Sequence, residues 1–308
     1  MKILVIGDLH GRKPKIHFRD FDCMVQVGDV CDDREFRPFI KKWFRLIKKD
    51  RNSAPGMDEL IIKKIGKRRF NEMEKRSLLR GRKILKYLNS FKKPVFFVPG
   101  NWDQSYGKTK IKDMDKNDFN YMRSFYDFYL GKNTNPKLIK GLKNIYDCQV
   151  KNNIFNKLNF LGYGLVSGNE KLKKGRILEL KKNQILILKK KYKKIYSQLS
   201  YAYSKREKKF PTIFLSHNVP YKTKLDRIKN KDSPGDKKHL GSSIARKFCE
   251  KYKPLICVGG HVHEGKGKDR LGKTALINPG FGENAQVLID IDESKEKVRS
   301  VKFFGNKK

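Results

Sequence analysis

Short apolar runs alternate along the chain with longer stretches whose apolar residues recur at helical spacing. Seven runs have the length and composition of buried strands: Ile3–Ile6, Cys23–Val27, Val95–Val98, Phe160–Tyr163, Thr212–Leu215, Leu255–Val258 and Thr274–Ile277. Near the end, Gln286–Ile291 and Val298–Phe304 flank the polar segment DESKEK and predict an antiparallel hairpin. The alternation predicts an α/β protein in which helices cover the sheet.

Two basic helical inserts interrupt this alternation. Residues 34–93 contain 21 Lys and Arg but only 6 Asp and Glu, and the segment NSAPGMD at 52–58 divides them into at least two helices. A second insert, about 180–208, contains a predicted helix from Leu180 to Arg206. Apolar residues recur along it every three or four positions and form one stripe: Ile185, Leu188, Tyr192, Ile195 and Leu199. We favour a helix face packed on the core, and an RNA-facing helix is the alternative. The interpretation is one domain, 1–308, with two inserts.

Composition restricts the class of protein. A chain of 308 residues with 38% hydrophobic and 11% aromatic residues can bury a sizeable core. No apolar run reaches the ~18 residues of a membrane span, and the first run is too short for a secretory signal. The five cysteines include no CxxC pair, which is typical of free thiols in a reducing compartment. We therefore expect a cytoplasmic protein.

The charge balance is strongly basic. The chain has 73 Lys and Arg against 32 Asp and Glu, a net charge of +41. A solvated basic face is the simplest interpretation. A polyanionic partner such as nucleic acid, or an anionic substrate attracted by the electric field, is the alternative.

Polar residues with side chains that can bind metal ions follow the predicted strands. The segments are GDLHG, GD, PGNWD, SHN and GGHVH. They contribute two carboxylates, one amide and four imidazoles at the expected carboxyl edge of a sheet: Asp8, His10, Asp29, Asn101, His217, His261 and His263. Four of the chain's six histidines lie in this set.

This ligand set suits divalent metal ions. Oxygen and imidazole ligands without thiolate fit Mn²⁺, Fe²⁺, Zn²⁺ or Ni²⁺, and we expect Mn²⁺ first. Seven ligands exceed the needs of one ion, so a shared carboxylate would divide them between two ions. Cys31 follows Asp29 closely and would suit a softer metal, but a small residue lining a loop is the favoured interpretation.

The ordered motifs D-x-H, GD, GN, H and GHxH resemble those of the calcineurin-like metallophosphoesterase superfamily. Residues 213–280 are most similar to predicted phosphoesterases of the ICC-like branch, through IFLSHNVPYKTKLD, KHLGSSIARKF, GGHVHEGKG and GKTALINPGF. The resemblance implies a four-layer sandwich of two mixed β-sheets flanked by helices. It also implies a dinuclear centre in which Asp8, His10, Asp29 and His263 bind one metal. Asp29, as the bridge, would bind the other with Asn101, His217 and His261.

The chain departs from the superfamily at one position. In much of the superfamily the residue after the GN asparagine is a histidine that protonates the leaving oxygen, whereas this chain has Trp102. An indole cannot act as a general acid near neutral pH. The proton would then come from water or from Asp103, or the protein would favour leaving groups that need little protonation, or it would be a weak catalyst. Trp102 itself would either stack on an aromatic substrate group or pack under the turn.

Other candidates for substrate contact lie further along the chain. Gly241-Ser242-Ser243 precedes an apolar-periodic stretch and predicts a helix start, a place where anions bind. His239 and Lys224 would join Ser242 in such a pocket. For any one of these residues an ordinary role, such as an N-cap, is the favoured interpretation.

The pattern as a whole predicts a metal-dependent phosphoesterase, most simply a phosphodiesterase. A hydroxide held between two metals would attack phosphorus, with Asp29, Asn101, His217 and His261 in the catalytic centre. The alternatives are a nuclease acting on RNA or DNA, and a nucleic-acid-binding protein with a weakly active metal site.

Overall fold

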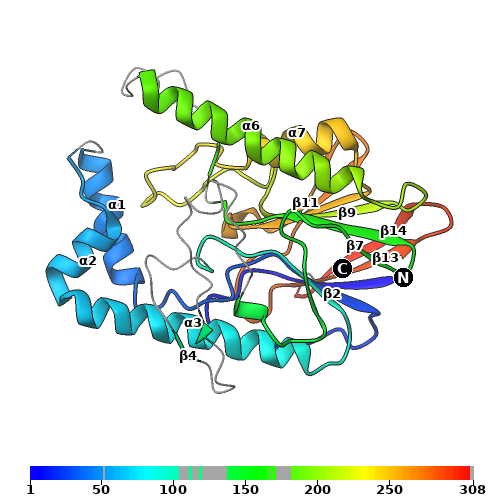
Figure 1. Ribbon diagram of the computed structural model, residues 1–308, viewed down its shortest axis with the longest axis horizontal. Coiled ribbons are helices and arrows are strands. Elements are labelled where there is room, and N and C mark those ends of the chain that lie inside the picture. The colour runs from blue at the N-terminus through cyan, green and yellow to red at the C-terminus, as the bar shows by residue number, and fades with distance from the viewer. Residues whose placement is uncertain are drawn as a thin grey trace.

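Two six-stranded mixed sheets form the centre of the protein (Figure 1). The computed structural model describes residues 1–50, 53–103, 111–112, 118–119, 137–166, 168–170 and 182–305. The first sheet has the order β14-β13-β1-β2-β3-β6. Its strands are β1 (Lys2–Ile6), β2 (Cys23–Gln26), β3 (Val95–Phe97), β6 (Ile145–Asp147), β13 (Gln286–Asp292) and β14 (Lys297–Phe303). Strands β1, β2, β3 and β6 are parallel, and β13 with β14 forms the predicted antiparallel hairpin.

The second sheet has the order β11-β12-β10-β9-β8-β7. Its strands are β7 (Asn153–Phe155), β8 (Leu158–Tyr163), β9 (Thr212–Asn218), β10 (Ile256–Gly260), β11 (Gly267–Leu271) and β12 (Thr274–Asn278). The four inner strands are parallel, and β11 and β7 form antiparallel edges. A separate two-stranded ladder joins β4 (Ile111–Lys112) to β5 (Asp118–Phe119).

Strand alternation builds three apolar layers. In β1, Ile3 and Val5 face the second sheet, whereas Leu4 and Ile6 face helix α3 (Lys67–Asn89). The rings of Phe96 in β3 and Phe160 in β8 stack across the two sheets with centroids 3.7 Å apart. Helices α6 (Lys182–Ser204) and α7 (Ser243–Tyr252) cover the outer face of the second sheet (Figure 1). The predicted four-layer sandwich is confirmed.

The first insert forms three helices: α1 (Arg37–Lys49), α2 (Met57–Ile65) and α3. Helix α1 has no buried residue, while Phe36 before it is buried with Ile61, Phe70 and Met73 in a small separate cluster. Helix α3 then runs along the first sheet and belongs to the main core. The prediction of helical pieces broken near 52–58 is therefore correct for the described residues, although α3 is an integral layer and not a peripheral addition.

Helix α6 packs on the core through part of the predicted stripe. Ile195 and Leu199 are buried, whereas Leu186 and Ile187, outside the stripe, are about half exposed. Residues 180 and 181 of the predicted helix lie outside the described residues. Short 3₁₀ turns η1 (Lys137–Ile139) and η2 (His263–Gly265) complete the elements. Among the described helices, none combines the length and apolar character needed to cross a bilayer.

Candidate metal centre

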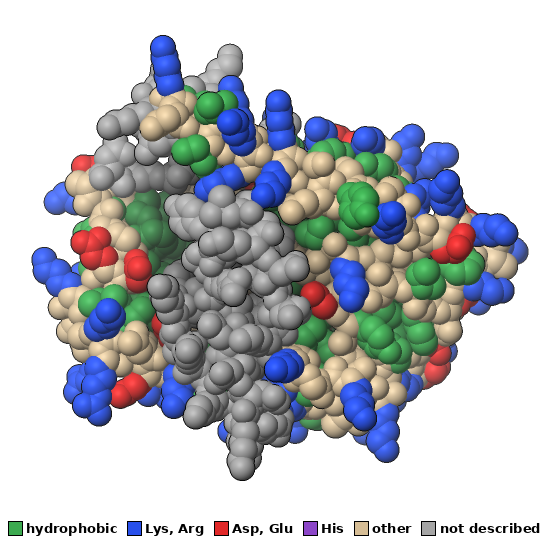
Figure 2. Space-filling model, viewed as in Figure 1, with side chains coloured by type: hydrophobic (Ala, Val, Ile, Leu, Met, Phe, Trp, Pro, Cys, Tyr) green, Lys and Arg blue, Asp and Glu red, His purple; other side chains and the backbone are tan. Residues whose placement is uncertain are grey.

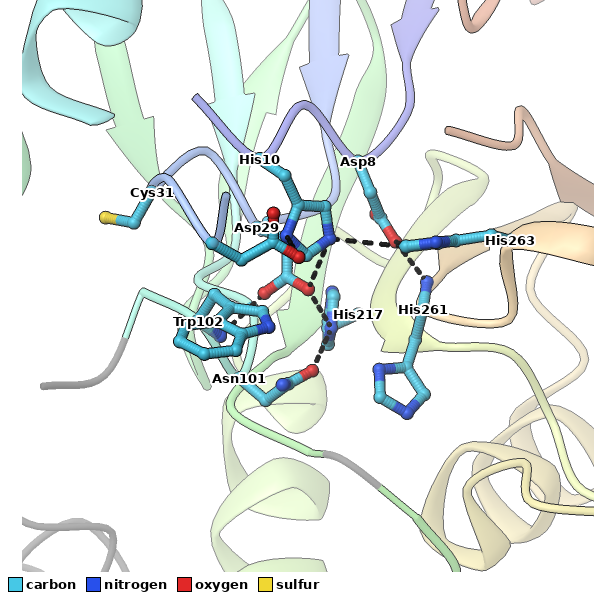
Figure 3. Close-up of polar contacts among 12 residues, drawn as sticks. Asp8, His10, Asp29, Cys31, Asn101, Trp102, His217, His261 and His263 are labelled. Atoms are coloured by element: carbon cyan, nitrogen blue, oxygen red, sulfur yellow. Dashed lines mark hydrogen bonds and ion pairs between the residues drawn. The ribbon is translucent and has the colours of Figure 1, made fainter. Parts of the chain in front are cut away.

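The predicted ligands meet at one edge of the two sheets. Asp8 and His10 follow β1, Asp29 follows β2, and Asn101 follows β3. His217 lies near the end of β9, and His261 and His263 follow β10. These strands are parallel within each sheet, so their carboxyl ends deliver the side chains to a common place. Figure 3 shows the seven side chains converging there.

The backbone at this edge is strained. His10, Asp29 and His261 have φ values of 43°, 54° and 65°, in the left-handed region that side chains with a Cβ seldom adopt. Strain of this kind persists only where the surrounding structure fixes it, and it concentrates at functional sites. Two glycines allow a ligand carboxylate to approach the backbone closely. A Cβ on Gly100 would lie 2.1 Å from Asp29 Oδ1, and one on Gly260 would lie 2.2 Å from Asp8 Oδ1.

One group of ligand atoms combines Asp8, His10 and His263. Their candidate ligand atoms all lie within 4.8 Å of one another. His263 Nε2 is 3.3 Å from Asp8 Oδ2 and 3.2 Å from His10 Nε2. The second oxygen of Asp8, Oδ1, is buried and has no hydrogen-bond donor among the described residues. A cation bound by Asp8 and these imidazoles is the group that would satisfy the buried, unpartnered carboxylate oxygen.

A second group combines Asp29, His217 and His261 within the same 4.8 Å limit. His217 Nδ1 lies 2.8 Å from the carbonyl oxygen of Val27, which can only accept a hydrogen bond. In the neutral ring this places the proton on Nδ1 and leaves a lone pair on Nε2, 2.9 Å from Asn101 Oδ1. A metal ion binds such a lone pair, and the carbonyl contact fixes the ring that presents it.

Asp29 joins the two groups through a single atom. Its Oδ2 is 3.3 Å from His10 Nε2 and 3.5 Å from His217 Nε2. Its other oxygen, Oδ1, accepts a hydrogen bond of 2.7 Å from the backbone N–H of Trp102. The Trp102 N–H therefore orients the carboxylate so that Oδ2 faces both groups. The donor set and its division fit two divalent cations sharing Asp29, the arrangement that the sequence predicts.

The pKa values of the histidines differ between the two ligand groups. Burial opposes protonation of His10, but the charges of Asp29 and Asp33 outweigh it and raise the pKa of His10 to about 10. Burial, reinforced by His217, instead lowers the pKa of His261 to about 4. Burial would raise the pKa of Asp29, yet His217 and His10 together lower it, so this carboxylate stays ionised. Asp29 therefore presents an ionised carboxylate between the two ligand groups.

Two residues at the centre were not predicted from the sequence. Asp33 Oδ2 lies 3.1 Å from His10 Nδ1, and Asp33 Oδ1 accepts a 2.9 Å hydrogen bond from Arg37 Nε. This carboxylate orients His10 from behind, as metal-binding imidazoles require. Phe281 stacks on His263 with centroids 4.3 Å apart. The segment GDVCDD carried the signal for Asp33, and Phe281 is the last residue of GKTALINPGF, a stretch that carried the family resemblance without indicating a role for this ring.

The Asp103 side chain is surrounded by backbone N–H groups, which it binds. It is fully buried, Oδ1 accepts hydrogen bonds from the backbone N–H groups of Val30 and Cys31, and Oδ2 accepts one from Gly100. Burial and the nearby Asp29 charge raise the pKa of the Asp103 carboxyl. Both oxygens are occupied in tying the turn after β3 to the turn after β2. This geometry provides no path for a proton from Asp103 to a leaving group.

Trp102 packs towards the first insert. Its ring centroid is 5.3 Å from that of Phe36 and 6.5 Å from that of His10. Trp102 is half-buried at the border of the cluster formed by Phe36, Ile61, Phe70 and Met73. Trp102 therefore packs against the insert, and the contact links the insert to the metal-binding turn.

The other proposed substrate contacts lie in a separate polar network. His239 Nδ1 is 2.6 Å from Asp226 Oδ1, and the Lys224 backbone N–H donates to Asp269. Ser242 is the N-cap of α7, accepting a 3.0 Å hydrogen bond from the Ala245 N–H.

The predicted anion site at the start of α7 already contains a carboxylate. Glu170 accepts hydrogen bonds from both Ser242 and Ser243, at distances of 2.5–2.9 Å. Burial raises the pKa of Glu170. This helix terminus is occupied by a carboxylate of the chain itself, so the substrate-anion pocket suggested for it stays a prediction. The structure gives Ser242 a capping role at this terminus.

Cys31 does not join the ligand groups. Figure 3 shows its side chain pointing away from them, and burial raises the pKa of its thiol far above the ordinary value. All five cysteines are free and buried. The interpretation of Cys31 as a small residue lining a loop agrees with this environment.

Comparisons with known proteins give a consistent picture. A model of the family described as calcineurin-like phosphoesterase matches residues 71–265. An uncharacterized protein of Methanocaldococcus jannaschii, MJ1162, is 38% identical over 76 residues. That match covers 23% of this chain and spans only 33% of the relative.

A comparison with solved structures bears on the fold. One crystal structure aligns over 99% of both chains with a TM-score of 0.56 and 16% identity, a similarity of fold alone. Phosphopantetheinyl hydrolase from Mycobacterium tuberculosis aligns over 91% of this chain and 89% of its own, at 11% identity and a TM-score of 0.47.

Proposed function

Because this chain belongs to the calcineurin-like phosphoesterase family, we propose that it hydrolyses phosphate esters with two divalent metal ions, and phosphodiesters in preference to monoesters. The observation that carries the proposal is the position of Asp29 Oδ2, within 3.5 Å of imidazoles from both ligand groups. A carboxylate oxygen in that position is the bridge that a two-metal phosphoesterase centre needs.

The roles of the side chains follow from their positions. Two bound cations would polarise the phosphoryl oxygens and supply an acidified water for in-line attack. Asp8, His10 and His263 would hold one cation, and His217, His261 and Asn101 the other, with Asp29 between them. Asp33 and the Val27 carbonyl fix the orientations of His10 and His217. We propose Mn²⁺ as the resident ion because this mixed oxygen–nitrogen ligand set suits it.

The preference for diesters rests on the leaving group. Trp102 offers no acidic proton, and Asp103 is committed to three backbone N–H groups. Solvent water must then protonate the leaving oxygen. Monoester hydrolysis has a loose transition state that places much negative charge on that oxygen, whereas the tighter transition state of a diester places less there. A centre without a general acid therefore penalises monoesters more.

The test is hydrolysis by Mn²⁺-loaded protein of bis(p-nitrophenyl) phosphate and p-nitrophenyl phosphate, and of a matched diester and monoester with an alkyl leaving group. We expect turnover of the p-nitrophenyl esters, and a higher kcat/KM for the diester than for the monoester in the alkyl pair, whose leaving oxygen needs a proton. His217→Gln should abolish turnover, while His17→Gln serves as the matched control, because His17 is exposed and contacts Asn284 outside the ligand groups. Folded, metal-loaded protein with no turnover would contradict the enzymatic function, and a monoester preference would contradict the diester assignment.

A nuclease is the second candidate, favoured by the net charge of +41. Lys and Arg side chains outnumber Asp and Glu on the face shown in Figure 2, but they are spread over it and do not form one patch. Such a surface attracts polyanions without specifying a binding path. Binding to RNA or DNA that weakens with salt, followed by Mn²⁺-dependent cleavage, would support a nuclease. Binding without cleavage would support a nucleic-acid-binding protein with a weakly active centre.

A further inference from the structure

Two arginines flank the metal centre where it opens to solvent. Among the ligands, the His263 side chain is 33% exposed, and its ring stacks on Phe281. The guanidinium carbons of Arg12 and Arg37 lie over the Phe281 ring, 4.6 Å and 5.1 Å from its centroid. Phe281 also lies edge-on to His10, with centroids 5.4 Å apart. One aromatic ring thus places two cations beside the first ligand group.

The two arginines differ in their polar partners. Arg37 Nε donates to Asp33, the carboxylate that orients His10. Arg12 donates a 3.4 Å hydrogen bond to the His10 carbonyl oxygen and forms no ion pair with a carboxylate of the described residues. A guanidinium has five N–H donors in its plane, and stacking over a ring leaves those donors free. Arg12 therefore holds unused donors next to a ligand of the centre.

The surroundings make this arrangement costly without an anion. Arg12 is partly buried and shares the Phe281 ring with Arg37, so two guanidinium groups lie close together and, of the two, only Arg37 is paired with a carboxylate of the described residues. An oxyanion would relieve the repulsion and satisfy the free donors in a bidentate contact. No such need exists at Arg34, whose guanidinium is paired with Asp32 at 2.8 Å.

We propose that Arg12, with Arg37, forms a subsite for a second anionic group of the substrate, a phosphate attached a short distance from the phosphoryl group at the metals. This inference rests on the proposed function of the centre and adds substrate selection to it. The second phosphate would bind over the Phe281 edge of the site while the scissile phosphate lies at the ligand groups. The shared chemistry is an oxyanion, which a terminal phosphate or the next phosphate of a nucleic-acid strand would supply.

The experiment compares thymidine 5′-(p-nitrophenyl phosphate) with the same ester bearing a 3′-phosphate. We expect kcat/KM to be about tenfold or more higher for the 3′-phosphorylated ester, as a charge-assisted contact predicts. In Arg12→Gln the ratio of the two values should fall towards one. Arg34→Gln, the matched control at a paired arginine, should keep the wild-type ratio. Equal values in the wild type, or a ratio unchanged by Arg12→Gln, would overturn the proposal.

A binding measurement separates failure of the subsite from failure of the proposed function. Isothermal titration of Mn²⁺-loaded protein with thymidine 5′-phosphate and thymidine 3′,5′-bisphosphate needs no turnover. Tighter binding of the bisphosphate, lost in Arg12→Gln but not in Arg34→Gln, would support the subsite even in an inactive protein. A 5′-phosphorylated thymidine dinucleotide carries an internal phosphate instead, and the ligand that gains more affinity identifies the natural source. Equal affinity for all three ligands would overturn the proposal.

Discussion

Substituting Asp29 by asparagine isolates the shared ligand atom. The Trp102 backbone N–H donates to Asp29 Oδ1, so the amide oxygen of an asparagine must occupy that position. The amide NH₂ then replaces Oδ2, the atom near both His10 and His217. An NH₂ group cannot ligate a cation, so one isosteric change should remove a ligand from both metals while the turn is preserved.

The expected magnitudes follow from these contacts. Loss of a residue that merely orients a ligand costs about 10–100-fold in metal affinity or activity, so loss of the bridging ligand should cost at least ~10²-fold in kcat. Asp29→Ala additionally leaves the Trp102 N–H without its acceptor. Because Trp102 is only half-buried, the alanine variant should be less stable than the asparagine variant by about 1 kcal/mol, near the lower end for an unmade hydrogen bond.

Three measurements check this reasoning. Metal content after dialysis reports occupancy, hydrolysis of bis(p-nitrophenyl) phosphate reports activity, and urea unfolding of the metal-free variants reports stability. We expect Asp29→Asn to fold, to bind fewer ions and to lose activity, and Asp29→Ala to unfold at lower urea. An asparagine variant that retains both ions and a rate within about threefold of wild type would refute the bridging role.

Three further predictions follow from single residues. Trp102→His should raise the rate of alkyl relative to p-nitrophenyl diester hydrolysis by ~10²-fold or more, because it supplies a general acid; an unchanged ratio would show that position 102 does not face the leaving group. Asp103→Ala should lower the unfolding free energy by about 3 kcal/mol, since three backbone N–H groups lose their acceptor, and lost activity at unchanged urea stability would instead indicate a catalytic acid. Burial raises the pKa of Asp147 to about 6, so the folded protein keeps a proton that the unfolded chain releases from about pH 4. Stability should therefore fall by up to about 3 kcal/mol between pH 4 and 6, and Asp147→Asn should lose that part of the pH dependence in urea titrations.

Much of this centre was predictable because its signals are local. Each ligand follows the end of an apolar run by two to five residues, and parallel strands bring such positions together whatever the loops between them do. His217 shows the limit of precision: the run Thr212–Leu215 continues as β9 to Asn218, so the histidine lies inside the strand. The edge strands β6, β7 and β11 were missed, because they are short or polar, partly exposed, and lack a continuous apolar run.

The remaining features depend on contacts between distant segments. Glu170 fills the start of α7 from more than 70 residues away, and no spacing rule predicts which carboxylate caps a helix. Phe281 reaches His263 because β12 returns the chain to the same edge, where Asp8 bridges to Phe281. Predicting where the Trp102 ring packs likewise requires knowing the position of Phe36 in the insert. Packing of this kind is set by the assembled fold and not by local sequence.

Electron paramagnetic resonance of the protein loaded with Mn²⁺ tests the central claim most directly. If Asp29 Oδ2 bridges two ions, two Mn²⁺ per chain should give the spectrum of an exchange-coupled pair, and Asp29→Asn should lose that coupling. A spectrum of isolated Mn²⁺, with one ion bound per chain in the wild type, would contradict the dinuclear centre and the function proposed from it.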